Sequence, residues 1–236
     1  MDLSVRDAAE RLGVDESRVR VLLRRGDLAG RRVAGRWLVL AEDVARRASF
    51  APMDGRLAGG RPMSPARGWA LLDLLDGGDA AWLSPSARSQ VRSLARRLAG
   101  AEASRWRAVL RARSDVLPVR AHPAAVDRLP GEPDVRMGGP SRAAAAGLDL
   151  VAFDSLPELY IRPEAWPALV TRYALEVGPG EPAFLARLPR GSWWPDSDAL
   201  SAPVVAADML EQAEPRAVAA AVALLNERAA GIRSVQ

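Results

Sequence analysis

Cysteine is absent from this chain of 236 residues, and histidine occurs only once, at His122. Without cysteine there are no disulfides and no thiolate metal ligands, and one imidazole cannot make a histidine-rich metal site. We therefore expect no metal site, no cofactor and no redox chemistry. Lysine is absent too, so all 33 basic residues are arginine.

Long apolar runs are also missing. The opening segment, MDLSVRDAAERL, is charged and lacks the apolar stretch of a secretion signal, and no run of 18 apolar residues follows it. We therefore expect neither secretion nor a membrane span, but a cytoplasmic protein. With 49% hydrophobic and 26% charged residues, the composition is typical of a soluble globular protein.

Charge is distributed unevenly along the chain. Residues 1–62 and 63–150 each contain 13 Arg against 9 acidic residues, whereas residues 151–236 contain 7 Arg against 11 acidic residues. A basic front and an acidic back suit a protein whose first part approaches phosphate groups. The length favours two or three compact units over one.

Two short helices joined by a turn are predicted at the start of the chain. Ser4 and Asp7 fit a capping box, and apolar residues then recur at positions 5, 8, 9 and 12. A second helix is predicted from Glu16 to Arg25, with Asp15 as its cap and Gly26 as its stop. Its buried stripe would consist of Val19, Leu22 and Leu23.

The outer face of the second helix is rich in arginine. Opposite the buried stripe lie Ser17, Arg20, Val21 and Arg24, with Arg18 and Arg25 at the flanks. A helix fits the DNA major groove, where arginine can pair with guanine through two hydrogen bonds. A solvated helix face is the alternative interpretation.

A β-hairpin is predicted after this helix. Residues 31–33 and 37–39 have the composition of short strands, joined by Ala34, Gly35 and Arg36, with Gly35 free to adopt a positive φ. Trp37 is expected in the core, and a short helix from residue 41 or 42 to 47 would bury Val44. As the wing of a winged helix-turn-helix, the hairpin could bring Arg36 and either Arg31 or Arg32 to a minor groove or to flanking phosphates.

The segment LSVRDAAERLGVDESRVRVLLRRGDLAGRRVAGRWLVLAEDVARR resembles the excisionase-like branch of the MerR helix-turn-helix family. The resemblance rests on the opening S-V-R-D-A-A-E-R-L-G-V, the R-R-G-D-L that ends the second helix, the G-R-W hairpin tip and the E-D-V after it. It implies DNA contacts on the second helix and at the hairpin tip, although Arg20 stands where many relatives have an aromatic residue. With the adjacent arginines, the predicted DNA-binding residues are Ser17, Arg18, Arg20, Arg24, Arg25, Arg31, Arg32 and Arg36.

Two further regions are predicted beyond a proline- and glycine-rich linker at residues 50–65. Residues 66–114 form a helical segment, with helices at 65–75, 86–98 and 103–113. Residues 115–236 mix strands at 116–119, 135–137, 159–161 and 183–188 with helices at 163–173, 203–211 and 215–228. The expected fold class is α+β: a winged helix-turn-helix at residues 1–49, the helical middle segment and a C-terminal mixed α/β domain.

The helical segment carries the densest basic stretch of the chain. This stretch, residues 88–113, contains eight arginines, at positions 88, 92, 96, 97, 105, 107, 111 and 113. A solvated surface and a second phosphate-contacting surface are both open interpretations. The last helix of the chain is expected to bury Val218, Ala221, Val222 and Leu225.

The region from about residue 141 onward resembles the C-terminal domain of AbiEi-type antitoxins from abortive-infection toxin–antitoxin systems. The resemblance lies in the order of elements and in the ending: a proline-led helix with A-A-D-M-L-E, an E-P-R turn and an alanine-rich helix. It implies an antitoxin that binds its own promoter and opposes a nucleotidyltransferase toxin encoded beside it. Many such antitoxins start with a different kind of winged helix, and in this the chain departs from the pattern.

No catalytic residues are predicted. Gly191 and Ser192, followed by Asp196 and Asp198, superficially resemble a nucleotidyltransferase motif, but the spacing is too short. His122 has no catalytic partners nearby and is expected to cap a helix or form a hydrogen bond. The adjacent tryptophans, Trp193 and Trp194, are expected to pack at a domain edge or to anchor a partner.

Together these features favour a DNA-binding transcriptional autorepressor that acts as the antitoxin of an AbiE-like type IV pair, and not an enzyme. The expected partner is double-stranded DNA of its own promoter, bound as a homodimer or cooperative oligomer because one small unit buries little surface. Two alternatives stay open: a stand-alone regulator with a ligand-sensing C-terminal domain, and an excisionase-like DNA-architectural protein.

Overall fold

The computed structural model describes residues 2–25, 28, 30–33, 35–41, 44, 63–148, 155–178, 180–212 and 214–232. The chain divides into two compact units, one of Met1–Gly60 with Val177–Glu181 and one of Arg61–Glu176 with Pro182–Gln236. Most of the predicted linker at residues 50–65 and most of the predicted helix at residues 41–47 lie outside the described residues, as does the predicted helix stop at Gly26. None of the described helices is long and apolar enough to cross a membrane.

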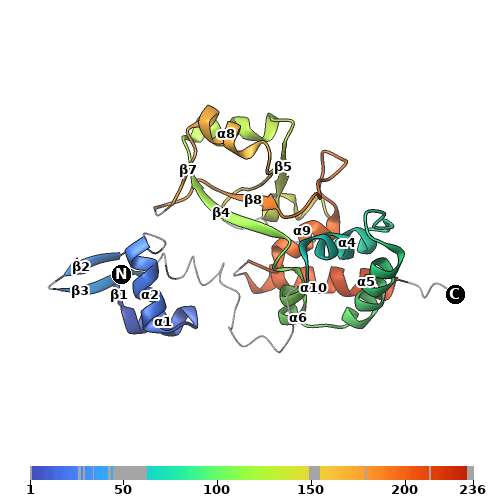
Figure 1. Ribbon diagram of the computed structural model, residues 1–236, viewed down its shortest axis with the longest axis horizontal. Coiled ribbons are helices and arrows are strands. Elements are labelled where there is room, and N and C mark those ends of the chain that lie inside the picture. Colours follow the sequence, from blue (N-terminus) through green and yellow to red (C-terminus); the bar gives the residue numbers. More distant parts are fainter. Residues whose placement is uncertain are drawn as a thin grey trace. The chain divides into compact units, whose positions relative to one another are not determined.

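Among the elements whose bounds the structure describes, the first unit has two helices and a small antiparallel sheet (Figure 1). The helices are α1 (Val5–Leu12) and α2 (Glu16–Arg25), and the strands are β1 (Asp2–Ser4), β2 (Gly30–Val33) and β3 (Arg36–Leu40), in the order β1-β3-β2. The predicted capping box is present: the Asp7 N–H donates to Ser4 Oγ at 3.1 Å, and the Ser4 N–H donates to the Asp7 carboxylate at 3.3 Å. Strand β1 was not predicted, because three residues show no periodicity.

The core of this unit contains the predicted apolar stripes of both helices. Val19, Leu22 and Leu23 of α2 are buried with Leu3 of β1 and Val39 of β3. Val44, for which burial was predicted, is fully buried. The two helices and the sheet therefore form one small core that holds α2 against the hairpin.

Two details of the hairpin differ from the prediction. Arg36 is not part of the loop, because it pairs with Val33 in the β2–β3 ladder; Gly35 does adopt a positive φ, of 79°. Trp37 is half-buried and packs at the margin of the core rather than inside it. Its ring is partly covered by the guanidinium of Arg32, which lies 5.6 Å from the ring centroid.

Gly30 is required at the start of β2 by a close approach of backbone and side chain. A Cβ atom at this position would lie 2.6 Å from Leu23 Cδ2 and 2.7 Å from the Leu38 carbonyl oxygen. We predict that Gly30→Ala destabilises the first unit by about 1–3 kcal/mol, as overpacking does in other cores. Thermal unfolding of the full chain, followed by circular dichroism, checks this. Gly131→Ala is the control, since a Cβ there meets nothing within 4 Å; equal stability of the two variants would contradict the prediction.

The second unit contains a five-stranded sheet in the order β5-β6-β8-β4-β7, apart from Val177 at the end of β7, which falls in the first unit. Its strands are β4 (Ser114–Arg120), β5 (Val135–Gly138), β6 (Glu158–Ile161), β7 (Glu176–Val177) and β8 (Phe184–Pro189). Strands β6 and β8 are parallel, whereas β4 is antiparallel to β8 and β5 to β6. One face of the sheet is covered by α8 (Trp166–Tyr173), where Leu169 packs with Ile161 and Phe184 (Figure 1).

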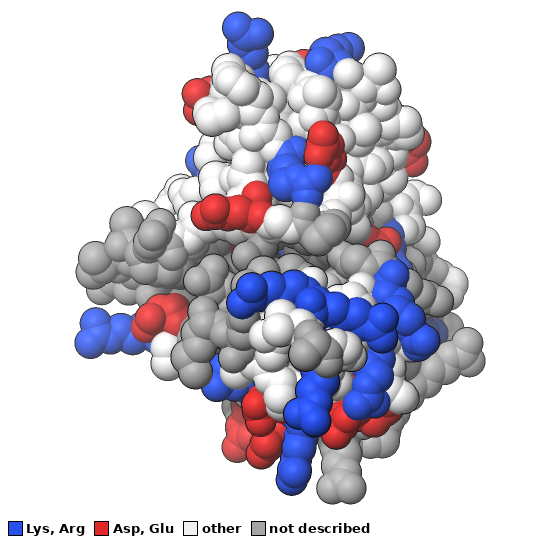
Figure 2. Space-filling view, turned by 90° about the vertical axis from the view of Figure 1, so that its left-hand side faces the viewer, with Lys and Arg blue, Asp and Glu red and all other residues white. Residues whose placement is uncertain are grey.

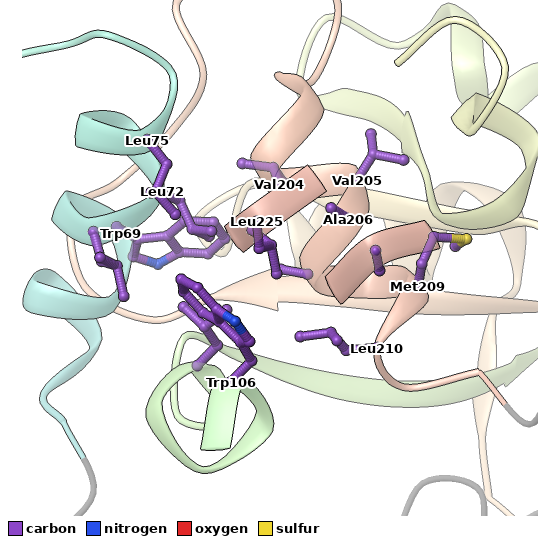
Figure 3. Packing of buried hydrophobic residues seen from close by; sticks show 14 of the residues in the cluster. Trp69, Leu72, Leu75, Trp106, Val204, Val205, Ala206, Met209, Leu210 and Leu225 are labelled. Atoms are coloured by element: carbon purple, nitrogen blue, oxygen red, sulfur yellow. The ribbon is translucent and has the colours of Figure 1, made fainter. Parts of the chain in front are cut away.

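The other face of the sheet meets a cluster of helices. These are α4 (Pro65–Leu75), α5 (Pro85–Leu98), α6 (Ala103–Leu110), α9 (Ala202–Met209) and α10 (Pro215–Ala230). Figure 3 shows Trp69 of α4 and Trp106 of α6 packed near Leu225 of α10, and both tryptophans are fully buried. The predicted boundary between residues 114 and 115 falls inside this unit.

The predicted helices and main strands of the second unit are present, with shifts at their ends. Helix α6 ends at Leu110 and not at Arg113. Helix α10 buries the stripe Ala217, Ala221, Leu225 and Ala229, whereas Val218 and Val222, predicted to be buried, are half-buried. His122 caps the short helix α7 (Pro123–Arg128), as expected: its Nδ1 accepts a hydrogen bond from the Ala124 N–H at 3.2 Å.

A buried ionic network joins the sheet to α9, and the sequence did not reveal it. Asp208 is fully buried and accepts hydrogen bonds from Arg113 at 2.8 Å and from the Tyr160 hydroxyl at 2.7 Å. Arg187, also buried, donates to Glu158 at 2.5 Å. Glu211 pairs with both arginines, at 2.7 Å from Arg113 and 3.0 Å from Arg187. Three carboxyl groups, of which that of Glu211 is only half-buried, therefore face two buried guanidinium groups.

The surplus carboxyl group makes the stability of this unit depend on pH. Burial, which outweighs the attraction of Arg187, raises the pKa of Glu158 from 4.5 to about 7. The folded protein therefore keeps a proton that the unfolded chain has lost, so we predict that the free energy of unfolding falls as pH rises from about 4.5 to about 7. Urea unfolding across this range measures the fall. Glu158→Gln should reduce it, and an unchanged pH dependence in that variant would contradict the assignment.

Candidate nucleic-acid interface

The outer face of α2 presents the predicted DNA-contacting side chains to solvent. Ser17, Arg20 and Arg24 are exposed on the side of the helix away from its buried stripe, and Arg18 is exposed at the flank of that stripe. The side chain of Arg25, the other predicted contact on this helix, lies outside the described residues. With ten residues, α2 is about 15 Å long, which suits insertion into a major groove.

Hydrogen bonds to Asp15 fix the start of α2. The Asp15 carboxylate accepts the Arg18 N–H at 2.8 Å and also the Ser17 hydroxyl. These bonds, that of Ser17 first, hold the pKa of Asp15 below its ordinary value. Because the Ser17 hydroxyl already donates its proton, it can offer a DNA base only its acceptor lone pairs.

Arg20 forms an ion pair with Glu16 one helical turn before it. The two side chains are 2.5 Å apart and about half exposed, at 49% and 44%. Such a surface pair contributes only about 0.3–0.5 kcal/mol, so it could readily be exchanged for a stronger contact with a base. The side chain of Arg24 is also exposed.

The hairpin places its three predicted DNA contacts on two faces. Arg31 lies opposite Leu38 and Val33 opposite Arg36 in the ladder, so Arg31 and Arg36 share one face of the sheet. Arg32 lies opposite Trp37 on the other face, which also carries the buried Val39. Of Arg31 and Arg32, it is therefore Arg31 that could contact DNA from the same face of the hairpin as Arg36.

Arginine side chains are prominent on one side of the first unit. Figure 2, which looks onto this side, shows them in blue across the lower half of the view, with acidic side chains in red toward its lower edge. A phosphate backbone is attracted to such a surface even without reading of the bases. The charge of this face is therefore compatible with DNA.

The second basic stretch is not a continuous surface. Arg113, which the sequence grouped with it, is 2% exposed and belongs to the buried ionic network. Arg107 is half-buried and donates to the Leu210 carbonyl oxygen at 2.5 Å. Two of the eight arginines proposed for a second phosphate-contacting surface are therefore engaged in contacts within the protein.

Comparison with known proteins agrees with the geometry of the first unit. Residues 3–49 match the family model of a helix-turn-helix domain. No curated protein and no solved structure matches the chain. The family match indicates a DNA-binding regulator and says nothing of residues beyond 49. Residues 3–49 of this chain form a helix-turn-helix domain.

Proposed function

We propose that this chain is a non-enzymatic transcriptional repressor of its own promoter. In this proposal α2 enters the major groove, and the β2–β3 hairpin is a wing that contacts the adjacent phosphates or minor groove. The observation that carries the proposal is the face of α2: its exposed arginines lie opposite the stripe that packs into the core. Binding as a dimer or in tandem would supply the contact area that one such unit lacks.

We further propose that the second unit gives the protein an antitoxin role. The support is the resemblance of its ending to AbiEi-type antitoxins, since α9 contains A-A-D-M and α10 begins at the proline of E-P-R. The gene neighbourhood provides the first check. An adjacent nucleotidyltransferase gene whose toxicity is relieved by co-expression of this chain is the expected result; an integrase gene in its place would favour an architectural role.

A change at Arg36 tests the wing. Neutralising one phosphate contact should lower the slope of log affinity against log salt by about one, so we predict this change for Arg36→Ala. Fluorescence anisotropy of full-length protein on DNA from upstream of its gene measures the slope. Arg216→Ala removes an exposed arginine at the start of α10 and serves as the control. The same slope in both variants would exclude Arg36 as a phosphate contact.

The main alternative function is a regulator that senses a small molecule. It is favoured by a cavity in the second unit, lined by residues of α4, α9 and the segment after β8. A regulator of this kind would bind DNA through the same α2 face and change its affinity for DNA when the ligand binds. Promoter binding with and without a ligand distinguishes it from an antitoxin, whose DNA binding requires no small molecule.

A further inference from the structure

The second unit contains a cavity of about 830 Å³. Leu72 of α4 and Val204 of α9 line it, together with the loop after α4 and the segment of residues 192–201. Pockets for small ligands have volumes of about 300–1,000 Å³, so the cavity is large enough for a drug-sized molecule. All of these residues belong to one compact unit, so the cavity does not depend on how the two units are placed.

The charged side chains that line the cavity are acidic. Asp73, Asp76 and Asp196 line it, and none of the described lining residues is basic. Burial raises the pKa of Asp76, and the charge of Arg228 opposes this rise. Asp73 already accepts a hydrogen bond from the Ala80 N–H at 2.8 Å, whereas Asp196 is exposed. A positively charged ligand would therefore be attracted to the cavity, and an anion repelled.

Tryptophan rings supply the apolar part of the lining. Trp82 is 49% exposed, and its Nε1–H donates to the Ala66 carbonyl oxygen at 3.3 Å. Trp193 is held by stacking on the buried Trp69, with ring centroids 3.7 Å apart and an angle of 2° between the planes. The ring of the third, Trp194, already has the Arg162 guanidinium 4.7 Å from its centroid. Trp82 and Trp193 are thus the rings left for a ligand.

Aromatic rings beside carboxylates form the arrangement that recognises organic cations, because a ring face attracts positive charge while its surface accommodates apolar groups. We propose that this cavity binds a small organic cation, with its apolar body against Trp82 and Trp193 and its charge balanced by Asp76 and Asp196. The site goes beyond the proposed repressor function and does not depend on DNA binding. Ligand binding would also give a reason for the exposure of Trp82, which packing in the core does not explain.

Binding of benzyltrimethylammonium to the full-length protein tests this site. Isothermal titration calorimetry and quenching of tryptophan fluorescence should show saturable binding, whereas benzyl alcohol and benzoate, which lack the positive charge, should bind far more weakly. Absence of saturable binding at millimolar concentration, or equal binding of benzoate, overturns the proposal.

Variants locate the binding on the cavity. Trp82→Ala should weaken the affinity for benzyltrimethylammonium about two- to thirtyfold, and Trp82→Phe should restore most of it. Asp76→Asn combined with Asp196→Asn should weaken it about tenfold. Asp79→Asn is the matched control, because this exposed carboxylate lies in the loop after α4 but is not among the residues that line the cavity. A loss of affinity in Asp79→Asn as large as in the double variant would mean general charge attraction and would overturn the site.

Discussion

Replacing both Arg20 and Arg24 by alanine is expected to weaken binding of the chain to its specific DNA site by about 2–6 kcal/mol. Each arginine that pairs with a base through two hydrogen bonds contributes about 1–3 kcal/mol to discrimination, and the two side chains lie one turn apart on α2. Binding to unrelated DNA should fall much less, because it depends on total charge. Anisotropy titrations with promoter DNA and with a scrambled duplex measure both effects.

Glu16→Gln is the informative control for this experiment. It removes the ion pair with Arg20 and leaves every arginine in place, so specific binding should stay the same or become tighter. The stability change should be small, since the pair is exposed. If the double arginine variant still discriminates the promoter from scrambled DNA as the unchanged protein does, α2 does not read the bases.

Asp208→Leu is expected to lower the free energy of unfolding of the second unit by about 3–5 kcal/mol. The substitution breaks the buried ion pairs of Asp208 with Arg113 and Arg187, whose guanidinium groups keep Glu158 and Glu211 as their remaining partners. It also removes the acceptor of the Tyr160 hydroxyl and of the Gly139 N–H. Because domains are stable by only about 5–15 kcal/mol, the loss would be a large share of the total.

Chemical denaturation of the full chain measures this loss, and Asp115→Leu provides the comparison. Asp115 pairs with Arg190 at 2.6 Å, but both side chains are about half exposed, at 47% and 52%. Removing that pair should cost at most about 1 kcal/mol. Equal losses in the two variants would show that the buried network contributes no more than a surface pair.

The first unit could be predicted largely from the sequence, because its signals are local. The capping box of Ser4 and Asp7, the apolar period of both helices and Gly35 at the hairpin turn each act within a few residues. The burial of Trp37 was predicted too high. Its exposure depends on its distance from the core along the hairpin, and the periodicity of apolar residues does not indicate this distance. The exposed arginines of α2 follow directly from the buried stripe on its opposite face.

The second unit shows where sequence patterns fail. Arg113 and Asp208 are 95 residues apart, and nothing in the surrounding sequence indicates that each neutralises the other. Charged residues are assigned to the surface by default, so Arg113 was placed in a basic stretch. The stripe of α10 was shifted for a related reason: the alanines at positions 217 and 229 are buried, although the larger residues Val218 and Val222 gave the stronger apolar signal.

The most direct test of the central claim is an affinity measurement of the full-length protein on promoter DNA and on a scrambled duplex of equal length, at about 50 and about 200 mM salt. A sequence-reading helix-turn-helix protein should bind the promoter at least about a thousandfold more tightly than the scrambled duplex, and salt should weaken both complexes. Equal affinity for the two duplexes, or no binding to either at the lower salt concentration, would contradict the account.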